Sequence, residues 1–206
     1  VTITGVDDTL FDGDITTTLT ATASNTGGYA GTETSTVTVK NTDDDTNGIS
    51  IAQTGTTDGS GNLRTTETGG SSTFTVVLNS QPTDTVTVSI TGLDTTENSL
   101  SSDTLTFTTA NWNTAQTVTI TGVDDTIVDG DITTTLTATT NSAGGYSGES
   151  TTTTVKNTDD DTNGISIAQT GTTDGSGNLL TTEAGSTTTF TVVLDAAPTA
   201  DITVSI

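Results

Sequence analysis

The chain of 206 residues contains no cysteine, no histidine and no methionine. Without histidine and cysteine it cannot build a Ser-His-Asp triad, a thiol nucleophile, or a zinc or haem site of the usual ligand types. Disulfide bonds are excluded for the same reason. Any site chemistry must therefore rest on oxygen-bearing side chains.

Basic residues are nearly absent as well. Lys40, Arg64 and Lys156 stand against 26 acidic residues, which gives a net charge of −23. A chain of this charge cannot neutralise nucleic-acid phosphates, and anionic membrane surfaces repel it. No apolar run approaches the ~20 residues that a transmembrane helix needs. We expect neither a nucleic-acid partner nor membrane insertion.

Hydrophobic residues make up only 28% of the chain and aromatic residues 3%. Such a low apolar content can indicate disorder. Here, however, 61 residues are threonine, and valine and isoleucine dominate the apolar positions. These β-branched residues favour strands, and no stripe with a helical period of 3.6 residues is present. The composition therefore indicates an ordered all-β protein.

The sequence repeats itself. Residues 1–9 return unchanged at 118–126, and residues 41–55 return unchanged at 157–171. Over 1–31, 33–45 and 46–90, 68 of 89 positions match their counterparts about 117 residues later. Self-similarity at a fixed period is typical of a tandem array.

The best frame divides the chain into three parts. Residues 46–161 form one complete repeat, 1–45 the C-terminal part of a preceding repeat, and 162–206 the N-terminal part of a following one. The two end parts do not add up to a repeat, because neither contains a counterpart of 91–117. We therefore interpret the chain as a window on a longer array, not as a subunit that completes itself by polymerisation.

Apolar residues alternate with polar ones in seven segments of the complete repeat. The segments centre on residues 49–51, 74–78, 86–90, 105–107, 118–120, 132–138 and 153–155. Turn sequences rich in Gly, Asn, Asp and Pro separate them. One apolar face on each strand is typical of antiparallel sheets packed face to face. We predict a seven-stranded antiparallel β-sandwich in tandem copies.

Acidic residues of the repeat gather in a few loops. The segment after 118–120 and the segment after 153–155 hold seven aspartates between them. In an up-and-down tracing, the ends of the first, third, fifth and seventh strands share one pole of the sandwich. These two segments should therefore meet, together with the loops that carry Glu67 and the group Asp94, Glu97 and Asp103.

So many carboxylates at one pole repel each other, by about 4 kcal/mol for two charges 4 Å apart near a protein surface. A divalent cation removes this cost. Ca²⁺ accepts irregular sets of six to eight oxygens, whereas Mg²⁺ demands a tighter octahedron. The alternative is a solvated acidic surface that only confers solubility. A further stretch, Asp58-Gly-Ser-Gly-Asn62, is either the start of a calcium loop or an ordinary turn.

The double-Asp and triple-Asp pieces resemble the Calx-beta domain, found in sodium–calcium exchangers and in large bacterial cell-surface and secreted proteins. The pattern is Glu67 before a glycine, Leu105-Thr-Phe107 with Trp112 nearby, residues 118–125, and Asp159-Asp160-Asp161, and it covers essentially the whole repeat. The resemblance implies an immunoglobulin-like sandwich of seven strands that binds Ca²⁺ at the distal pole.

The resemblance also implies ligand roles for acidic residues in all three parts. In the complete repeat these are Glu67, Asp94, Asp124, Asp125, Asp129, Asp131, Asp159, Asp160 and Asp161. The preceding part supplies Asp7, Asp8, Asp12, Asp14, Asp43, Asp44 and Asp45, and the following part supplies Glu183. Where Asp94 stands, the family has an aspartate followed by an aromatic residue, but here Thr95 follows.

Asp161 is followed after only three residues by the next strand at Ile165, so a metal at the closing aspartates would lie between two sandwiches. We therefore expect Ca²⁺ to stiffen the junctions of an extracellular bacterial surface protein, such as an adhesin stalk, filament or coat, with neighbouring repeats as partners. Homo-assembly into a filament or layer is a further expectation, because polar edge strands without lysine protect weakly against pairing.

An alternative function is a calcium-dependent adhesive module that binds a glycan or a partner protein through its loops. Tyr29, Tyr146 and Trp112 lie near the pole away from the acids, where they either pack or bind. We favour packing. An enzyme is not expected, because paired catalytic carboxylates need one acid with a raised pKa in an apolar cleft. No set of aromatics that could line such a cleft is present.

Overall fold

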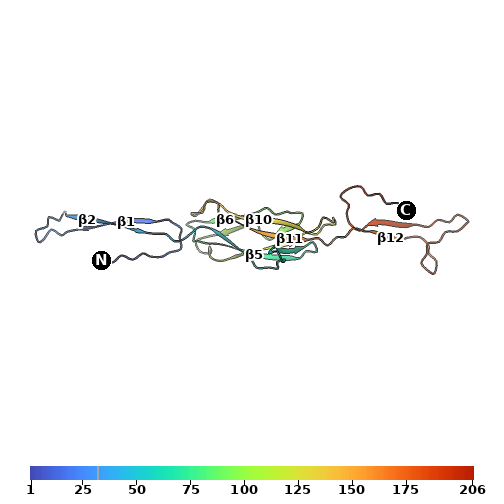
Figure 1. Cartoon of the computed structure of the whole chain (residues 1–206), viewed down its shortest axis with the longest axis horizontal. Helices are drawn as coiled ribbons and strands as arrows, with labels where there is room; N and C mark the ends of the chain where they lie inside the picture. Colours follow the sequence, from blue (N-terminus) through green and yellow to red (C-terminus); the bar gives the residue numbers. More distant parts are fainter. Residues whose placement is uncertain (32) are drawn as a thin grey trace.

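A computed structural model describes residues 1–31 and 33–206. All regular elements of this part of the chain are β-strands. The molecule is elongated, with a sandwich in the middle and one hairpin at each end (Figure 1). Within the described ranges, no helix could cross a membrane.

The sandwich consists of two sheets. The first has the order β3-β5-β9-β7. Its strands are β3 (Ile49–Gln53), β5 (Ser71–Leu78), β9 (Gln116–Gly122) and β7 (Asn98–Leu100). The second has the order β4-β11-β10-β6-β8. Its strands are β4 (Leu63–Thr66), β11 (Ser150–Thr158), β10 (Ile132–Thr140), β6 (Val86–Thr91) and β8 (Thr104–Phe107).

Burial alternates along the strands of the sandwich. In β5 every second residue from Ser72 to Leu78 is buried, and β6 and β9 show the same period of two. The inward side chains of both sheets form one apolar core, in which Phe74 and Phe107 are fully buried. Trp112 packs against its margin. This alternation is what the sequence pattern predicts, because successive side chains of a strand point to opposite faces.

The structure confirms the predicted all-β, immunoglobulin-like sandwich class. All seven predicted strands are present, and two short strands, β4 and β7, are added to them. β4 pairs in parallel with β11, whereas the other strand pairs of the sandwich are antiparallel. The chain thus leaves the first sheet after β3 and joins the second sheet at β4.

β4 and β7 are missing from the predicted set because each is short and combines a single apolar residue with a buried polar one, so neither shows an alternation of apolar residues. Thr65 in β4 and Asn98 in β7 are about as buried as the core residues. The Thr65 hydroxyl lies 2.9 Å from Asn98 Oδ1 and 3.0 Å from Asn157 Oδ1. Hydrogen bonding between the two sheets makes this polar burial tolerable. A search for apolar alternation cannot detect such strands.

The two end sections are single hairpins. β1 (Ile15–Thr22) pairs with β2 (Thr34–Asn41), and β12 (Ile165–Gln169) pairs with β13 (Phe190–Leu194). Both sections keep the sequence pattern of the sandwich but lack the opposing sheet. Their apolar side chains are therefore exposed.

Candidate metal centre

Four chain segments meet at one end of the sandwich, which we call the acidic pole: the turn at Glu67, the segment 94–97 before β7, the β9–β10 loop, and residues 159–161 after β11. The Val123 amide donates to the Glu97 carbonyl at 2.8 Å, and the Glu67 amide to the Thr158 carbonyl at 3.1 Å. The Gly130 amide donates to Asp159 Oδ2 at 2.7 Å. The structure thus brings together segments that follow alternate strands and that the sequence therefore places at one pole.

The first group of acids consists of Glu67, Asp159 and Asp161. One carboxylate oxygen from each lies within 4.8 Å of the others. Calcium–oxygen distances are about 2.3–2.6 Å, so oxygens spaced in this way can share one Ca²⁺. Asp161 Oδ2 is shielded from solvent and has no hydrogen-bond partner. It is a free ligand atom within the group.

The second group consists of Glu97, Asp125 and Asp129, again with ligand oxygens within 4.8 Å of one another. Asn157 Nδ2 donates to Glu97 Oε2 at 3.2 Å and fixes that carboxylate. Glu97 is absent from the predicted ligands. Its position in a loop expected at the acidic pole was the sequence signal for a ligand role. The family resemblance pointed to Asp94 instead.

Two of these acids are almost completely buried: Glu67 is 2% exposed and Glu97 4%. Across residues 1–31 and 33–206, the ion pairs are Lys156 with Asp131 at 2.6 Å, and Lys40 with Asp14. Neither buried glutamate therefore has a cationic side chain beside it. Buried charges in proteins are generally paired with an opposite charge or bound to a metal. This burial separates the acidic pole from an ordinary solvated acidic surface.

The pKa values of Glu67 and Glu97 reflect this burial without a cationic partner. Burial raises the pKa of Glu67 to about 7, and the charges of Asp159, Asp125 and Glu97 add to this effect. Burial also raises the pKa of Glu97, with Asp129, Asp94 and Asp125 contributing. The pole therefore favours taking up positive charge, as protons or as a metal ion.

We expect the metal-free sandwich to be more stable at about pH 5.5 than at about pH 8. Glu67 has an unfolded pKa near 4.5 and a folded pKa near 7. Between these values the folded chain binds more protons than the unfolded chain, so stability falls as the pH rises. Melting in a chelator, followed through Trp112 fluorescence, measures the effect. A melting temperature that rises from pH 5.5 to 8 would contradict it.

The remaining predicted ligands of the repeat lie around the two groups. Asp131 is held by Lys156, which lowers its pKa, and it accepts the Asp159 amide at 3.2 Å. Asp131 thus positions Asp159. The Asp160 amide donates to Glu67 Oε2 at 3.4 Å. Burial raises the pKa of Asp161, and the charges of Asp159, Asp160, Asp125 and Asp124 add to this effect. Asp94 accepts hydrogen bonds from Thr96 in a local turn and belongs to neither group.

The preceding section repeats part of this arrangement. The Gly13 amide donates to Asp43 Oδ2 at 2.6 Å, and the Asp43 amide donates to Asp14 Oδ1 at 3.0 Å. Six of its seven predicted ligands line one pocket: Asp7, Asp8, Asp12, Asp43, Asp44 and Asp45. Asp14 is instead paired with Lys40. Residues 1–45 correspond to the part of the repeat that follows Glu67 and Glu97, so this set is made of aspartates alone.

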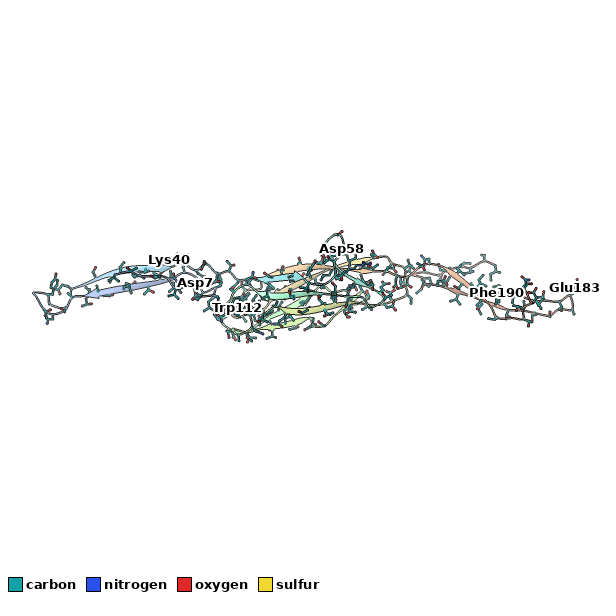
Figure 2. The ribbon with its side chains drawn as sticks, turned by 90° about the horizontal axis from the view of Figure 1, so that it is seen from below. Asp7, Lys40, Asp58, Trp112, Glu183 and Phe190 are labelled. Carbon is teal, nitrogen blue, oxygen red and sulfur yellow. The ribbon has the colours of Figure 1, made fainter. Side chains whose placement is uncertain are left out.

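Glu183 lies at the far end of the C-terminal section, as Figure 2 shows, whereas Asp7 lies close to the sandwich. Glu183 is exposed, and no acidic group of the described chain includes it. It is the counterpart of Glu67 in an incomplete repeat. The structure therefore does not bring it together with the other predicted ligands.

Asp58 behaves as a turn residue. Its carboxylate accepts the amides of Ser60 and Asn62 at 2.8 and 2.9 Å and the Asn62 side-chain amide at 2.9 Å. These bonds lower its pKa, with the Asn62 side chain contributing most. The counterpart Asp174 makes the same bonds. The geometry therefore matches the turn interpretation of this stretch.

The aromatic loop residues of the sandwich are engaged in packing. Tyr146 is 3% exposed, and its hydroxyl donates to the Ser80 carbonyl at 2.8 Å. Trp112 packs against the core. Tyr29, the counterpart of Tyr146, is 60% exposed at the tip of the N-terminal hairpin, where no opposing half covers it.

Gly122 is the last residue of β9, at the end of the strand that leads into the β9–β10 loop of the acidic pole. A β-carbon there would collide with the Thr66 carbonyl oxygen and lie 2.6 Å from Asn157 Oδ1. We expect Gly122→Ala to cost about 1–3 kcal/mol, as overpacking does in cores. Gly59→Ala is the matched control, because a β-carbon at Gly59 meets nothing within 4 Å. Denaturant unfolding followed through Trp112 compares them, and equal midpoints would contradict the close packing.

Two solved structures resemble the chain at low sequence identity. No protein-family model and no curated protein matches the chain. An ASH/PapD-like domain of human CEP192 (PapD-like domain 7) is 11% identical with a TM-score of 0.38, covering 55% of this chain and 86% of that one. The YadV chaperone is 10% identical with a TM-score of 0.39, covering 60% of this chain and 61% of its own.

Proposed function

We propose that the chain is a calcium-binding structural repeat segment of a large extracellular bacterial surface, stalk or filament protein. In this proposal, Ca²⁺ binds at the acidic pole and stiffens the junction with the next repeat. The chain's own residues support each step: two buried glutamates without a cation, ligand oxygens at calcium spacing, and a loop that serves both the site and the junction.

The β9–β10 loop carries the proposal. Asp125 and Asp129 belong to the second acid group. Between them, the Thr126 carbonyl accepts the Ala197 amide of the following section at 2.6 Å, and Ile127 forms a β-bridge with Ala197. Asp125 Oδ1 accepts the Ile127 amide at 2.6 Å and holds this part of the loop in shape. Ligands and junction contacts thus alternate along one short segment.

The same contact occurs at the other junction. The Thr9 carbonyl of the preceding section accepts the Gln81 amide of the sandwich at 2.7 Å, and Leu10 forms a β-bridge with Gln81. Thr9 and Leu10 are the counterparts of Thr126 and Ile127. An interaction that returns at both junctions is a property of the repeat, not of one loop.

Calcium would act on this junction by fixing the loop. Without a cation, repulsion among the carboxylates opposes the loop conformation that presents Thr126 and Ile127. With Ca²⁺ bound, that repulsion is removed and the contact with Ala197 is stabilised. Extracellular modules bind Ca²⁺ with affinities of about 10⁻⁴–10⁻³ M, close to extracellular calcium concentrations. Rigidity of the array would then depend on an extracellular location.

Amide hydrogen exchange at Ala197, measured by NMR on the full chain, tests the coupling. We expect Ca²⁺ to slow exchange at Ala197 by at least about tenfold, which corresponds to ~1.4 kcal/mol of added protection. Asp125→Asn should remove this effect. Asp84→Asn, the same change away from the acidic pole, should leave it intact. Unchanged exchange at Ala197 in the presence of bound Ca²⁺ would contradict the proposal.

A further inference from the structure

A layer of three neutral polar side chains separates the apolar core of the sandwich from the acidic pole. Thr65, Asn98 and Asn157 form this polar layer, and each of them is 1% exposed. The Thr65 hydroxyl lies 2.9 Å from Asn98 Oδ1 and 3.0 Å from Asn157 Oδ1. Polar side chains at this depth are generally hydrogen-bonded. The layer therefore ties strands of both sheets together just beneath the acids.

The polar layer is one step of a gradient along two paired strands. β4 and β11 run parallel, and Thr65 lies opposite Asn157. The pair two residues before them belongs to the apolar core. Because side chains on one face of a strand recur every second residue, the positions two residues after them continue the same face. These positions are Glu67 and Asp159, which belong to the first acid group.

Asn157 connects the polar layer to the second acid group. Its Nδ2 donates to Glu97 Oε2 at 3.2 Å, whereas its Oδ1 faces the Thr65 hydroxyl. Both ends of the side-chain amide are used, which fixes its orientation. Among the described residues, no other side chain donates to Glu97. Asn157 is therefore the neutral donor that holds this buried carboxylate beside Asp125 and Asp129.

Asn98 has the same burial as Asn157 but not the same connection. Its Oδ1 faces the Thr65 hydroxyl, as Asn157 Oδ1 does. Its Nδ2 is shielded from solvent and has no hydrogen-bond partner among the described residues. Asn98 thus supports the polar layer without holding an acid, and it matches Asn157 in residue type, burial and common partner.

Gly122 leaves the room that Asn157 needs, and this arrangement recurs. A β-carbon at Gly122 would lie 2.6 Å from Asn157 Oδ1. In the preceding section, a β-carbon at Gly5 would lie 2.7 Å from Asn41 Oδ1. Gly5 and Asn41 are the counterparts of Gly122 and Asn157. An asparagine seated against a glycine is therefore a property of the repeat.

We propose that Asn157 is a positioning residue of the second acid group and holds Glu97 in the place where a divalent cation binds. This inference rests on the proposed calcium function and deepens it. The first acid group does not need this bond, because the Asp160 amide donates to Glu67 Oε2 at 3.4 Å. Loss of the Asn157 side chain should therefore weaken cation binding at one group of the pole and spare the other.

Titration of the full-length Asn157→Ala chain with Ca²⁺, followed by NMR, tests this assignment. The Asp129 amide reports the second acid group, and the Asp161 amide reports the first. The Ca²⁺ concentration at half-saturation should rise about 10–100-fold at Asp129, as is typical when a residue that orients a metal ligand is lost. It should change little at Asp161. An unchanged value at Asp129, or an equal rise at both amides, would overturn the proposal.

Asn98→Ala is the matched control. It should lower the midpoint of denaturant unfolding, as Asn157→Ala does, because each change removes a buried side chain that contacts Thr65. Unlike Asn157→Ala, it should leave the titration at Asp129 as in the unaltered chain. If Asn98→Ala weakens binding at Asp129 as much, the role of Asn157 is structural and the proposal fails.

A double variant shows whether Asn157 acts through Glu97. In a chain that already carries Glu97→Gln, Asn157→Ala should cause no further loss of binding at Asp129, because effects of residues that act together are not additive. A further loss of the full size would contradict the proposal. Asn157→Ser, whose side chain is one bond shorter and ends short of Glu97, replaces Asn157→Ala if the alanine variant does not fold.

The unaltered chain separates failure of this inference from failure of the calcium function. No response to Ca²⁺ at either amide would contradict the calcium function, and the positioning role with it. Responses at both amides that Asn157→Ala leaves unchanged would overturn the positioning role alone and leave the calcium function standing.

Discussion

We expect Glu67→Gln to raise the melting temperature of the calcium-free chain and to abolish the further rise that Ca²⁺ produces in the parent. Glu67 is buried, its pKa is raised to about 7, and no cationic side chain is paired with it. A neutral amide of the same size removes the buried charge. The rise in the pKa of Glu67 corresponds to about 3 kcal/mol of free energy of unfolding. Screening by nearby solvent reduces the expected gain in stability to on the order of 1–2 kcal/mol.

The loss of the calcium response follows from the ligand geometry. Glu67 contributes one of three oxygens that lie within 4.8 Å of one another. An amide is neutral and a weaker calcium ligand than a carboxylate. Melting of both chains at about pH 8, with chelator and with Ca²⁺, gives the two effects separately. A variant that melts lower than the parent without Ca²⁺ would show that Glu67 is stabilised by contacts other than a metal.

Glu149→Gln is the matched control for this result. Glu149 is partly buried, but hydrogen bonds from the Ser147 amide and the Ser147 and Thr140 side chains outweigh that burial and lower its pKa. Its charge is therefore satisfied in the folded chain. Neutralising it should lower the melting temperature and leave the calcium response intact. The same chemical change thus has opposite signs at the two glutamates.

The second large effect is expected in the core. Phe74→Ala should destabilise the sandwich by about 3–5 kcal/mol, because it removes a fully buried aromatic side chain. Phe190→Ala, the same change at the counterpart position, should change the unfolding of the sandwich by less than about 0.5 kcal/mol. Phe190 lies in the C-terminal hairpin, away from the core (Figure 2).

Denaturant unfolding followed through Trp112 measures both variants, because Trp112 is the single tryptophan and packs against the sandwich core. Equal losses at Phe74 and Phe190 would mean that the C-terminal section shares the cooperative unit of the sandwich. The expected difference instead identifies the sandwich as the unit that unfolds.

Period-two alternation was enough to predict the seven main strands and the fold class. It failed for β4 and β7, because each has only one apolar residue, and Thr65 and Asn98 occupy buried positions in them. Thr65 and Asn98 are joined by a hydrogen bond between the sheets. Such partners are distant in sequence and cannot be identified from local pattern. For the same reason, the sequence pattern could not predict the parallel pairing of β4 with β11.

The acidic pole could be predicted in outline, because loops at alternate strand ends share one pole. The choice between Asp94 and Glu97 could not. Asp94 turns back on Thr96, whereas Glu97 is buried and held by Asn157. Both lie in one short loop with similar chemistry, and only the path of the backbone separates them. The ligand roles of all these acids remain predictions.

The contact of Thr126 and Ile127 with Ala197 could not be predicted from the sequence either. Thr126 and Ile127 read as ordinary loop residues between two acids, and Ala197 as a residue before a proline. Their contact depends on how one sandwich follows the next. It becomes significant because Thr9, Leu10 and Gln81 repeat it.

Calorimetric titration of the metal-stripped full chain with Ca²⁺, together with melting followed through Trp112, tests the calcium-bound pole most directly. We predict saturable binding and a raised melting temperature, both lost when Asp159 and Asp161 are changed together to Asn. Changing Asp84 to Asn, away from the acidic pole, should preserve both. No binding heat and an unchanged melting temperature in Ca²⁺ would contradict a calcium-stabilised repeat and leave the pole as an acidic surface.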